Sequence, residues 1–138
     1  MAIRGTKPKA AGVSDNRHKP VHEWTDVPNV PNTNVYPLPP LRCDGEPWSR
    51  QARAKWEAWS VMPHAALWSD AEWHFVMDTL ELCELFYGGN SKVAGEIRNR
   101  EKVFGTTREF RRDLRIRYVD AKAHTLAAVA DMDDYREL

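Results

Sequence analysis

The sequence lacks the features that mark export, membrane insertion or a disulfide scaffold. Its 138 residues include only two cysteines, and no apolar run reaches 18 residues. Because Cys43 and Cys83 follow no spacing pattern, the sequence favours a reduced intracellular protein. The absence of a long apolar run and of a charged-then-apolar leader predicts neither a membrane span nor a signal peptide.

Catalytic signatures are also missing. The sequence has no glycine loop followed by Lys-Ser/Thr, no nucleophile elbow and no His-Glu-x-x-His. His18 and His22 are four residues apart but lie in a proline-rich stretch, and the other histidines are isolated. We therefore expect a protein that is not an enzyme, with no catalytic residues, no metal site and no cofactor.

The net formal charge is zero, which excludes a uniformly basic DNA coat and a highly charged disordered chain. This balance conceals opposite blocks. Residues 62–91 carry five acidic residues and no lysine or arginine, whereas residues 92–117 carry nine basic and four acidic residues. A partner of the folded protein would meet these blocks rather than the mean charge.

Eight of the nine prolines lie in residues 1–47, where they exclude a helix or an interior strand. We expect a flexible arm with a basic start, with a stretch around Val35–Leu41 lying on the folded part. The predicted division is an arm (1–47), a helical oligomerisation and DNA-binding core (48–118), and a helical or acidic tail (119–138).

Helical periodicity begins at Trp48, and cap residues set the boundaries. Ser49 is a cap, Ser69 and Glu72 form a capping box, and Gly88-Gly89 is a stop signal. No segment is typical of a strand, so the predicted fold is all-α, a small helical-hairpin bundle. The expected helices are about Arg50–Val61, Asp70–Tyr87 and Lys92–Phe104, then one from a capping box at Thr106–Glu109 to about Tyr118 or through Ala130.

The helix predicted over Asp70–Tyr87 is apolar over more than the usual stripe. One interpretation makes it the central helix of a monomeric bundle. The other, which we favour, places one face on its own chain and another on a neighbouring subunit, because five of six tryptophans lie within 48–73 and interfaces are rich in large aromatics. The candidate interface residues are Trp56, Trp59, Trp73, Val76, Leu80, Leu82 and Phe86.

Four arginines repeat at helical spacing in the basic block: Arg108, Arg111, Arg112 and Arg115. A stripe of guanidinium groups suits phosphate oxygens and gives affinity without sequence readout. Alternatively, these arginines form ion pairs with the acidic block (62–91), within the chain or between subunits. A helix-turn-helix over Lys92–Tyr118 matches only in part. The further candidate DNA contacts are Arg98, Lys102, Lys7 and Lys9.

Three stretches together resemble the small terminase subunit of tailed double-stranded DNA bacteriophages. The start Arg4-Gly5-Thr6-Lys7-Pro8-Lys9 is similar to the basic opening of such subunits. The stretch from Glu46-Pro47-Trp48 to Trp68-Ser69-Asp70-Ala71-Glu72 resembles their entry into a helical hairpin. The segment Phe104-Gly105-Thr106-Thr107 with Arg111-Arg112-Asp113-Leu114-Arg115 is similar to their closing segment.

The resemblance implies a homo-oligomeric ring that binds viral double-stranded DNA and presents it to the large terminase subunit in the cytoplasm of the infected bacterium. Many family members begin with a helix-turn-helix, whereas this chain begins with a proline-rich arm. The alternative function is a small helical transcription regulator or a protein-interaction adaptor.

Overall fold

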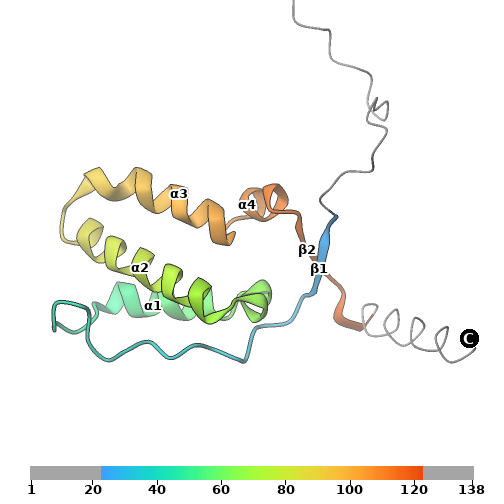
Figure 1. Ribbon diagram of the computed structural model, residues 1–138, viewed down its shortest axis with the longest axis horizontal. Helices are drawn as coiled ribbons and strands as arrows, with labels where there is room; N and C mark the ends of the chain where they lie inside the picture. Colours follow the sequence, from blue (N-terminus) through green and yellow to red (C-terminus); the bar gives the residue numbers. More distant parts are fainter. Residues whose placement is uncertain (1–22, 123–138) are drawn as a thin grey trace, which may run out of the picture.

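Figure 1 shows the computed structural model, which describes residues 23–122 and is mostly helical there. In chain order the elements are strand β1 (Thr25–Pro28), helix α1 (Arg50–Ser60), 3-10 helix η1 (Pro63–Leu67), helix α2 (Asp70–Tyr87), 3-10 helix η2 (Ser91–Val93), helices α3 (Ala94–Phe104) and α4 (Arg108–Asp113), and strand β2 (Ile116–Val119). The predicted helical character is confirmed, and the exclusion of strands is wrong.

Local capping signals set the boundaries of α1 and α2. The Ser49 hydroxyl accepts a hydrogen bond from the Ala52 amide. At the start of α2, Ser69 and Glu72 form the reciprocal capping box that the sequence predicts. The predicted extent of α2, from Asp70 to Tyr87, is confirmed. Because these caps satisfy amides that have no partner inside a helix, local residues favour the starts of α1 and α2 at these positions.

The core lies between α2 and its neighbours α1 and α3, which pack beside it (Figure 1). Large aromatic rings fill this space: Trp73 lies 5.6 Å from Trp56 and 4.7 Å from Trp68, centroid to centroid. Such edge-on and tilted ring pairs favour a dense core. The buried core cluster is Trp48, Ala52, Trp56, Trp59, Ala65, Trp73, Val76, Leu80, Cys83, Ile97 and Phe104.

The segment between β1 and α1 runs along these helices (Figure 1) and covers part of their surface. The Tyr36 ring stacks on Trp73 at 6.1 Å, and its hydroxyl lies 3.1 Å from His74 Nε2. The buried Asn32 side chain donates to the Ser60 carbonyl at 3.0 Å. The Trp48 indole donates to the Pro39 carbonyl at 2.8 Å. These contacts place the expected stretch around Val35–Leu41 against the core.

The strands β1 and β2 form a parallel pair, with Thr25 opposite Ile116 and Pro28 opposite Val119. The predicted continuation of the fourth helix to Tyr118 is therefore wrong, because α4 ends at Asp113. Arg115 takes the left-handed conformation, with φ of 56°, and redirects the chain into β2. The run Ile116–Val119 contains β-branched and aromatic residues, and this composition is the sequence feature that could have predicted the strand.

The link between α3 and α4 also differs from the prediction. Gly105 ends α3 with φ of 77°, and a Cβ there would lie 3.2 Å from Leu114 Cδ1 and 3.3 Å from His64 Nε2. The α4 cap is Thr107, whose side chain accepts from the Phe110 amide, so the expected capping box at Thr106 and Glu109 is wrong by one residue. A left-handed residue that close to its neighbours requires glycine.

His64 joins η1 to the end of α3 and to β2. Its Nε2 lies 2.6 Å from the Phe104 carbonyl, and its Nδ1 lies 2.6 Å from the Tyr118 hydroxyl. A carbonyl only accepts, so Nε2 carries the hydrogen and the neutral ring accepts at Nδ1 from Tyr118. Burial, together with the Arg111 cation, lowers the pKa of His64. This neutral ring therefore holds β2 against the helices.

Glu84 makes a second long-range connection, at the opposite end of α2. Its buried carboxylate accepts from the Arg42 guanidinium at 2.7 Å, from the Ser49 amide at 3.2 Å and from the Ser49 hydroxyl. Burial disfavours its charge, but these hydrogen bonds outweigh burial and lower the pKa of the Glu84 carboxyl. Glu84 thus links α2 to the α1 cap and to the loop before it.

The division into arm (1–47), core (48–118) and tail (119–138) stays a prediction, and residues 1–22 and 123–138 lie outside the described residues. Among the helices of residues 23–122, none combines the length and hydropathy that crossing a membrane requires.

The first prediction concerns Glu84. Glu84→Gln should lower the free energy of unfolding at pH 7 by about 1–3 kcal/mol, because charged hydrogen bonds to a buried group are lost. Urea denaturation measures this change, and Asp78→Asn, at an exposed position of the same helix, is the matched control. Because its folded pKa is lowered, the Glu84 contribution is present above its unfolded pKa of about 4.3 and is lost as the pH falls below that value. Equal effects of the two variants would contradict this role.

The second prediction concerns His64 and a higher pH range. Since its folded pKa is lowered, its stabilising contribution is complete above the unfolded pKa of about 6.5 and declines as the pH falls toward the folded value. In the native protein, the urea concentration at the midpoint of unfolding should decrease as the pH is lowered from 7.5 to 6.5 and 5.5. His64→Gln should flatten this decrease, whereas His74→Gln, at an exposed position, should keep it. An unchanged profile in His64→Gln would refute the connection.

Candidate nucleic-acid interface

The basic block contributes exposed side chains from α3. Arg98 and Lys102 lie one helical turn apart, and both are exposed. Within residues 23–122 neither makes an ion pair. Arg100 instead contacts its own chain: it pairs with Glu96 at 3.0 Å, and its guanidinium lies 5.5 Å from the Phe75 ring. The exposed Arg98 and Lys102 are therefore the α3 cations available to a phosphate.

Helix α4 adds two exposed arginines. Arg108 and Arg112 are four residues apart and lie on one side of this short helix. The Arg112 side chain is 67% exposed, and its 3.7 Å ion pair with Glu109 is solvent-exposed and therefore weak. Both guanidinium groups can turn toward phosphate oxygens at little cost.

Arg111 differs from its neighbours because it binds its own chain. Its guanidinium donates to the carbonyls of Gly105 and Thr106 at 3.3 Å each and lies 4.7 Å from the Tyr118 ring centroid. These contacts place a cation at the carboxyl end of α3, where carbonyl groups lack helical partners. Arg111 therefore supports the α3–α4–β2 junction, and its contact with DNA stays a prediction.

The four arginines do not form the continuous helical stripe that the sequence predicts. Arg115 follows α4 in the left-handed conformation, and it is exposed at the start of β2. The i, i+3, i+4, i+7 spacing applies only along one helix, and α4 has just six residues. The prediction that all four arginines lie along one face of a single helix is therefore wrong. DNA contact by these arginines stays a prediction. Lys7 and Lys9 lie outside the described residues.

The opposite charges of the two blocks do not meet within the chain. Across residues 23–122, no ion pair joins an acidic residue of 62–91 to a cation of 92–117. Glu84 pairs with Arg42, which precedes both blocks. Of the alternatives for the basic block, pairing with α2 inside one chain is therefore not observed.

The structure places the candidate interface residues in two environments. Trp56, Trp59, Trp73, Val76 and Leu80 are buried within the single chain. The segment before α1 covers part of the α2 surface that sequence periodicity leaves uncovered. Leu82 is half-buried, and Phe86 is 44% exposed beside Leu85, which is 52% exposed. Only this carboxyl-terminal part of α2 presents candidate interface residues to solvent.

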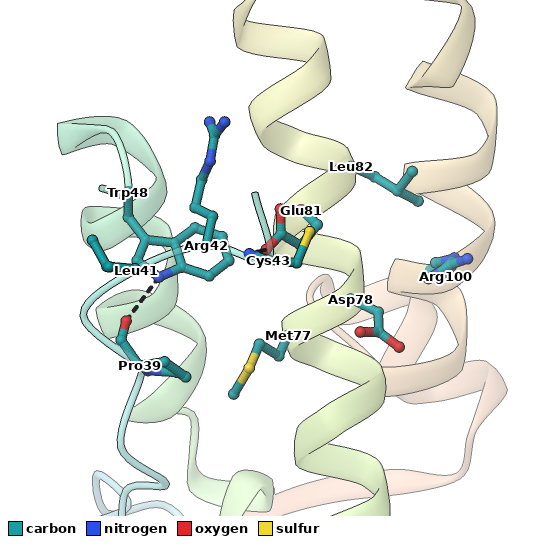
Figure 2. A pocket seen from close by; sticks show the side chains of 10 residues that line it. All are labelled: Pro39, Leu41, Arg42, Cys43, Trp48, Met77, Asp78, Glu81, Leu82 and Arg100. Carbon is teal, nitrogen blue, oxygen red and sulfur yellow. Dashed lines mark hydrogen bonds between the residues drawn. The ribbon is translucent and has the colours of Figure 1, made fainter. Parts of the chain in front are cut away.

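A hollow of about 540 Å³ lies between residues 39–43, α2 and Arg100 (Figure 2). Leu41, Met77 and Leu82 give it apolar walls, and Asp78 and Glu81 add negative charge. Cys43 is its only thiol among the lining residues, and the Glu81 carboxylate, above all, raises its pKa. A thiol held in its protonated form is a poor nucleophile. The hollow thus combines apolar walls with acidic side chains and one thiol.

No cluster of His, Cys, Asp or Glu in residues 23–122 has the arrangement of a metal site. The strongest candidate site in the described part of the chain is the set of exposed cations on α3, on α4 and directly before β2: Arg98, Lys102, Arg108, Arg112 and Arg115. Sequence reasoning identified them by charge, but it could not separate them from Arg111, because the junction that engages Arg111 depends on residues far away in the chain.

Comparison with known proteins gives a family but no individual relative. No curated protein and no solved structure gives a significant match to the chain. One family model, described as phage terminase small subunit, matches residues 3–138. Since the match extends over almost the whole chain, including α3, α4 and the basic start, the protein belongs to the phage terminase small subunit family.

Proposed function

We propose that this protein is a noncatalytic DNA-packaging component that binds viral double-stranded DNA through its exposed basic residues. Membership of the terminase small subunit family supports a role in phage DNA packaging. One observation supports the proposed DNA-binding surface: exposed cations lie on α3, on α4 and directly before β2, and they form no ion pair with an acidic residue of α2. The proposed phosphate contacts are Arg98, Lys102, Arg108, Arg112 and Arg115, with Lys7 and Lys9 in support.

The proposed mode of binding is to phosphates rather than to base edges. Helix α4 has only six residues and carries the ion pair between Arg112 and Glu109 on its surface. A helix that reads the major groove needs several side chains aligned on one exposed face, which α4 is too short to supply. Contacts from dispersed arginines and lysines instead give salt-dependent affinity with little sequence preference.

Assembly is the second part of the proposal. The exposed apolar residues at the end of α2 (Leu82, Leu85 and Phe86) fit an interface between copies of the chain. The assembled protein would present DNA to the large terminase subunit in the cytoplasm of the infected bacterium. The alternative, a transcription regulator or protein-interaction adaptor, is favoured by the same cations if they bind acidic groups of a partner protein.

The third prediction separates phosphate contacts from structural arginines. Arg108→Gln with Arg112→Gln should weaken duplex binding and lower the slope of log affinity against log salt by about two for each contacting subunit. The melting temperature of this double variant should equal that of the native protein. Arg111→Gln should reduce stability by about 1 kcal/mol through lost hydrogen bonds. Fluorescence anisotropy and thermal denaturation measure both quantities. A duplex affinity that is negligible in the native protein, or unaffected by the Arg108/Arg112 change, would favour the alternative function.

The fourth prediction tests the interface. Phe86→Asp should lower the assembly mass while leaving the helical content intact, because Phe86 is exposed in the isolated chain. Native mass spectrometry gives the mass, with Val103→Asp as control, since Val103 is a 61%-exposed apolar residue of α3. Leu80→Asp is unsuitable, because Leu80 is fully buried and the charge would unfold the chain. If Phe86→Asp kept the native assembly mass, this interface would be rejected.

A further inference from the structure

The strand pair carries an exposed aromatic ring on its outer face, the face turned away from the helices. Successive side chains of a strand point to opposite faces of its sheet. Val27 is buried and its partner Tyr118 is half-buried, so these two residues mark the inner face. Asp26 and Arg117, also opposite one another, are exposed on the outer face. Trp24 directly precedes β1 and is 42% exposed, and the alternation places it on the outer face as well.

A guanidinium group, rather than apolar side chains, contacts the Trp24 ring. The Arg117 guanidinium lies over this ring, 5.5 Å from its centroid, which is within the range of a cation–π interaction. Among residues 23–122 no other aromatic ring contacts Trp24, and the buried core cluster does not include it. Tryptophan has a large apolar surface to bury, and the fold leaves much of it exposed here. Trp24 therefore keeps ring surface that a ligand can cover.

Arg115 links this ring to the proposed duplex contacts. The Thr25 amide donates to the Arg115 carbonyl at 2.7 Å, so the backbones of Trp24 and Arg115 are neighbours at the start of the strand pair. Arg115 also lies two residues after α4, which Figure 1 shows beside β1 and β2. Its side chain is exposed, and it forms no ion pair with any residue of the described range 23–122. A DNA strand that leaves the α4 cations can therefore reach Trp24 by way of Arg115.

The charges around Trp24 nearly balance. Arg117 pairs with Asp26 at 2.8 Å, and the exposed Glu23 directly precedes Trp24. With Arg115, two cations thus lie near two acidic groups, and a phosphate group alone would gain little at this place. The distinctive feature is the ring, which favours a flat group that can stack on it.

A nucleobase is such a group. Aromatic side chains bind single-stranded nucleic acids by stacking on successive bases, and this contact tolerates any sequence because every base has a π-face. Exposed aromatics on the face of a sheet, with cations beside them, are one recurring form of such a site. The bases of an intact duplex are stacked on one another and paired, so they cannot reach an external ring. The ligand that fits Trp24 is therefore an unpaired base.

We propose that Trp24 is a stacking site for an unpaired DNA base beside the duplex contacts of α4, with Arg115 contacting a phosphate of the same strand. This inference rests on the proposed function, since it assumes that the α4 cations bind the adjoining duplex. It specifies a form of the DNA, a duplex with unpaired bases at its end, and it distinguishes such an end from the interior of a duplex.

The test measures binding of the full chain to three DNA molecules that share one sixteen-base-pair duplex. The first is blunt, the second has a forked end of five unpaired thymidines on each strand, and the third has the same fork built from abasic sites. The abasic fork keeps the phosphates and lacks the bases. Fluorescence anisotropy at constant salt gives each affinity. We expect the native protein to bind the thymidine fork about five-fold or more tightly than the abasic fork, because at least one base stacks.

Three variants assign this preference to the ring. Trp24→Leu should bind the two forks with equal affinity and should bind the blunt duplex like the native protein, which also verifies that it is folded. Trp24→Phe keeps an aromatic ring and should keep most of the preference. Phe86→Leu is the matched control, because Phe86 is 44% exposed and lies at the end of α2 where the chain turns toward α3, away from the strand pair (Figure 1). This control should keep the full preference.

The possible failures are distinguishable. If the native protein binds the blunt duplex but binds both forks with equal affinity, the stacking site is overturned and the proposed function stands. If Trp24→Leu loses the same factor on all three molecules, the ring supports the fold or the duplex surface, and the stacking site is again overturned. If the native protein does not bind the blunt duplex, the proposed function itself fails, and this inference fails with it.

Discussion

The parallel pairing of Thr25–Pro28 with Ile116–Val119 is the constraint on which the arrangement of the basic region depends. A two-stranded sheet is marginal by itself in water, so this pair requires support from the rest of the protein. Val27 is buried, and Tyr118 is bound by His64, whose other ring nitrogen is bound to the end of α3. The strand pair and the helical core therefore stabilise one another through the neutral His64 ring.

This support also explains the unusual backbone of the α3–α4–β2 junction. A chain that must pair with β1 directly after α4 has no room for a longer helix, and Arg115 adopts the left-handed conformation to enter β2. The conformation of a non-glycine residue there costs of order 1 kcal/mol, which contacts around it must offset. Arg111 supplies part of that compensation through two carbonyl groups and the Tyr118 ring. An arginine that sequence reasoning assigns to DNA thus has a structural task.

The sequence was sufficient for elements whose signals are local and insufficient for those fixed by distant partners. The caps Ser49 and Ser69 with Glu72 act within one helical turn, so α1 and α2 are predictable from their own residues. The strand β2 has a partner about ninety positions earlier in the chain, and no local pattern specifies that pairing. Tyr118 continues the four-residue spacing of Phe110 and Leu114, which predicts a helix there.

The same distinction applies to the candidate sites. Periodicity alone assigned the apolar surface of α2 to a neighbouring subunit, but it could not show that Tyr36 and Trp48, from outside α2, help to cover this core. Among the predicted interface residues, the buried ones are unavailable to a partner, and only those at the end of α2 near Phe86 are exposed. For the basic block, charge selects the candidate region, and only the tertiary contacts of Arg111 and Arg100 distinguish structural arginines from accessible ones.

The separation of charge gives the surface its physical character. Among residues 23–122, ion pairs join Arg42 to Asp44 and to Glu84 of α2, and each of the other paired arginines (Arg100, Arg112 and Arg117) to an acid outside α2. The acidic residues of α2 therefore form no ion pair with the cations of α3 and α4. Uncompensated charge of one sign on a low-dielectric surface attracts mobile counterions, and a polyanion that displaces them gains their release. Duplex DNA offers such a polyanion, with phosphates every 1.7 Å or so along its axis. The exposed cations are the electrostatic basis of the proposed duplex binding, and the exposed apolar residues at the end of α2 are the basis of the proposed assembly.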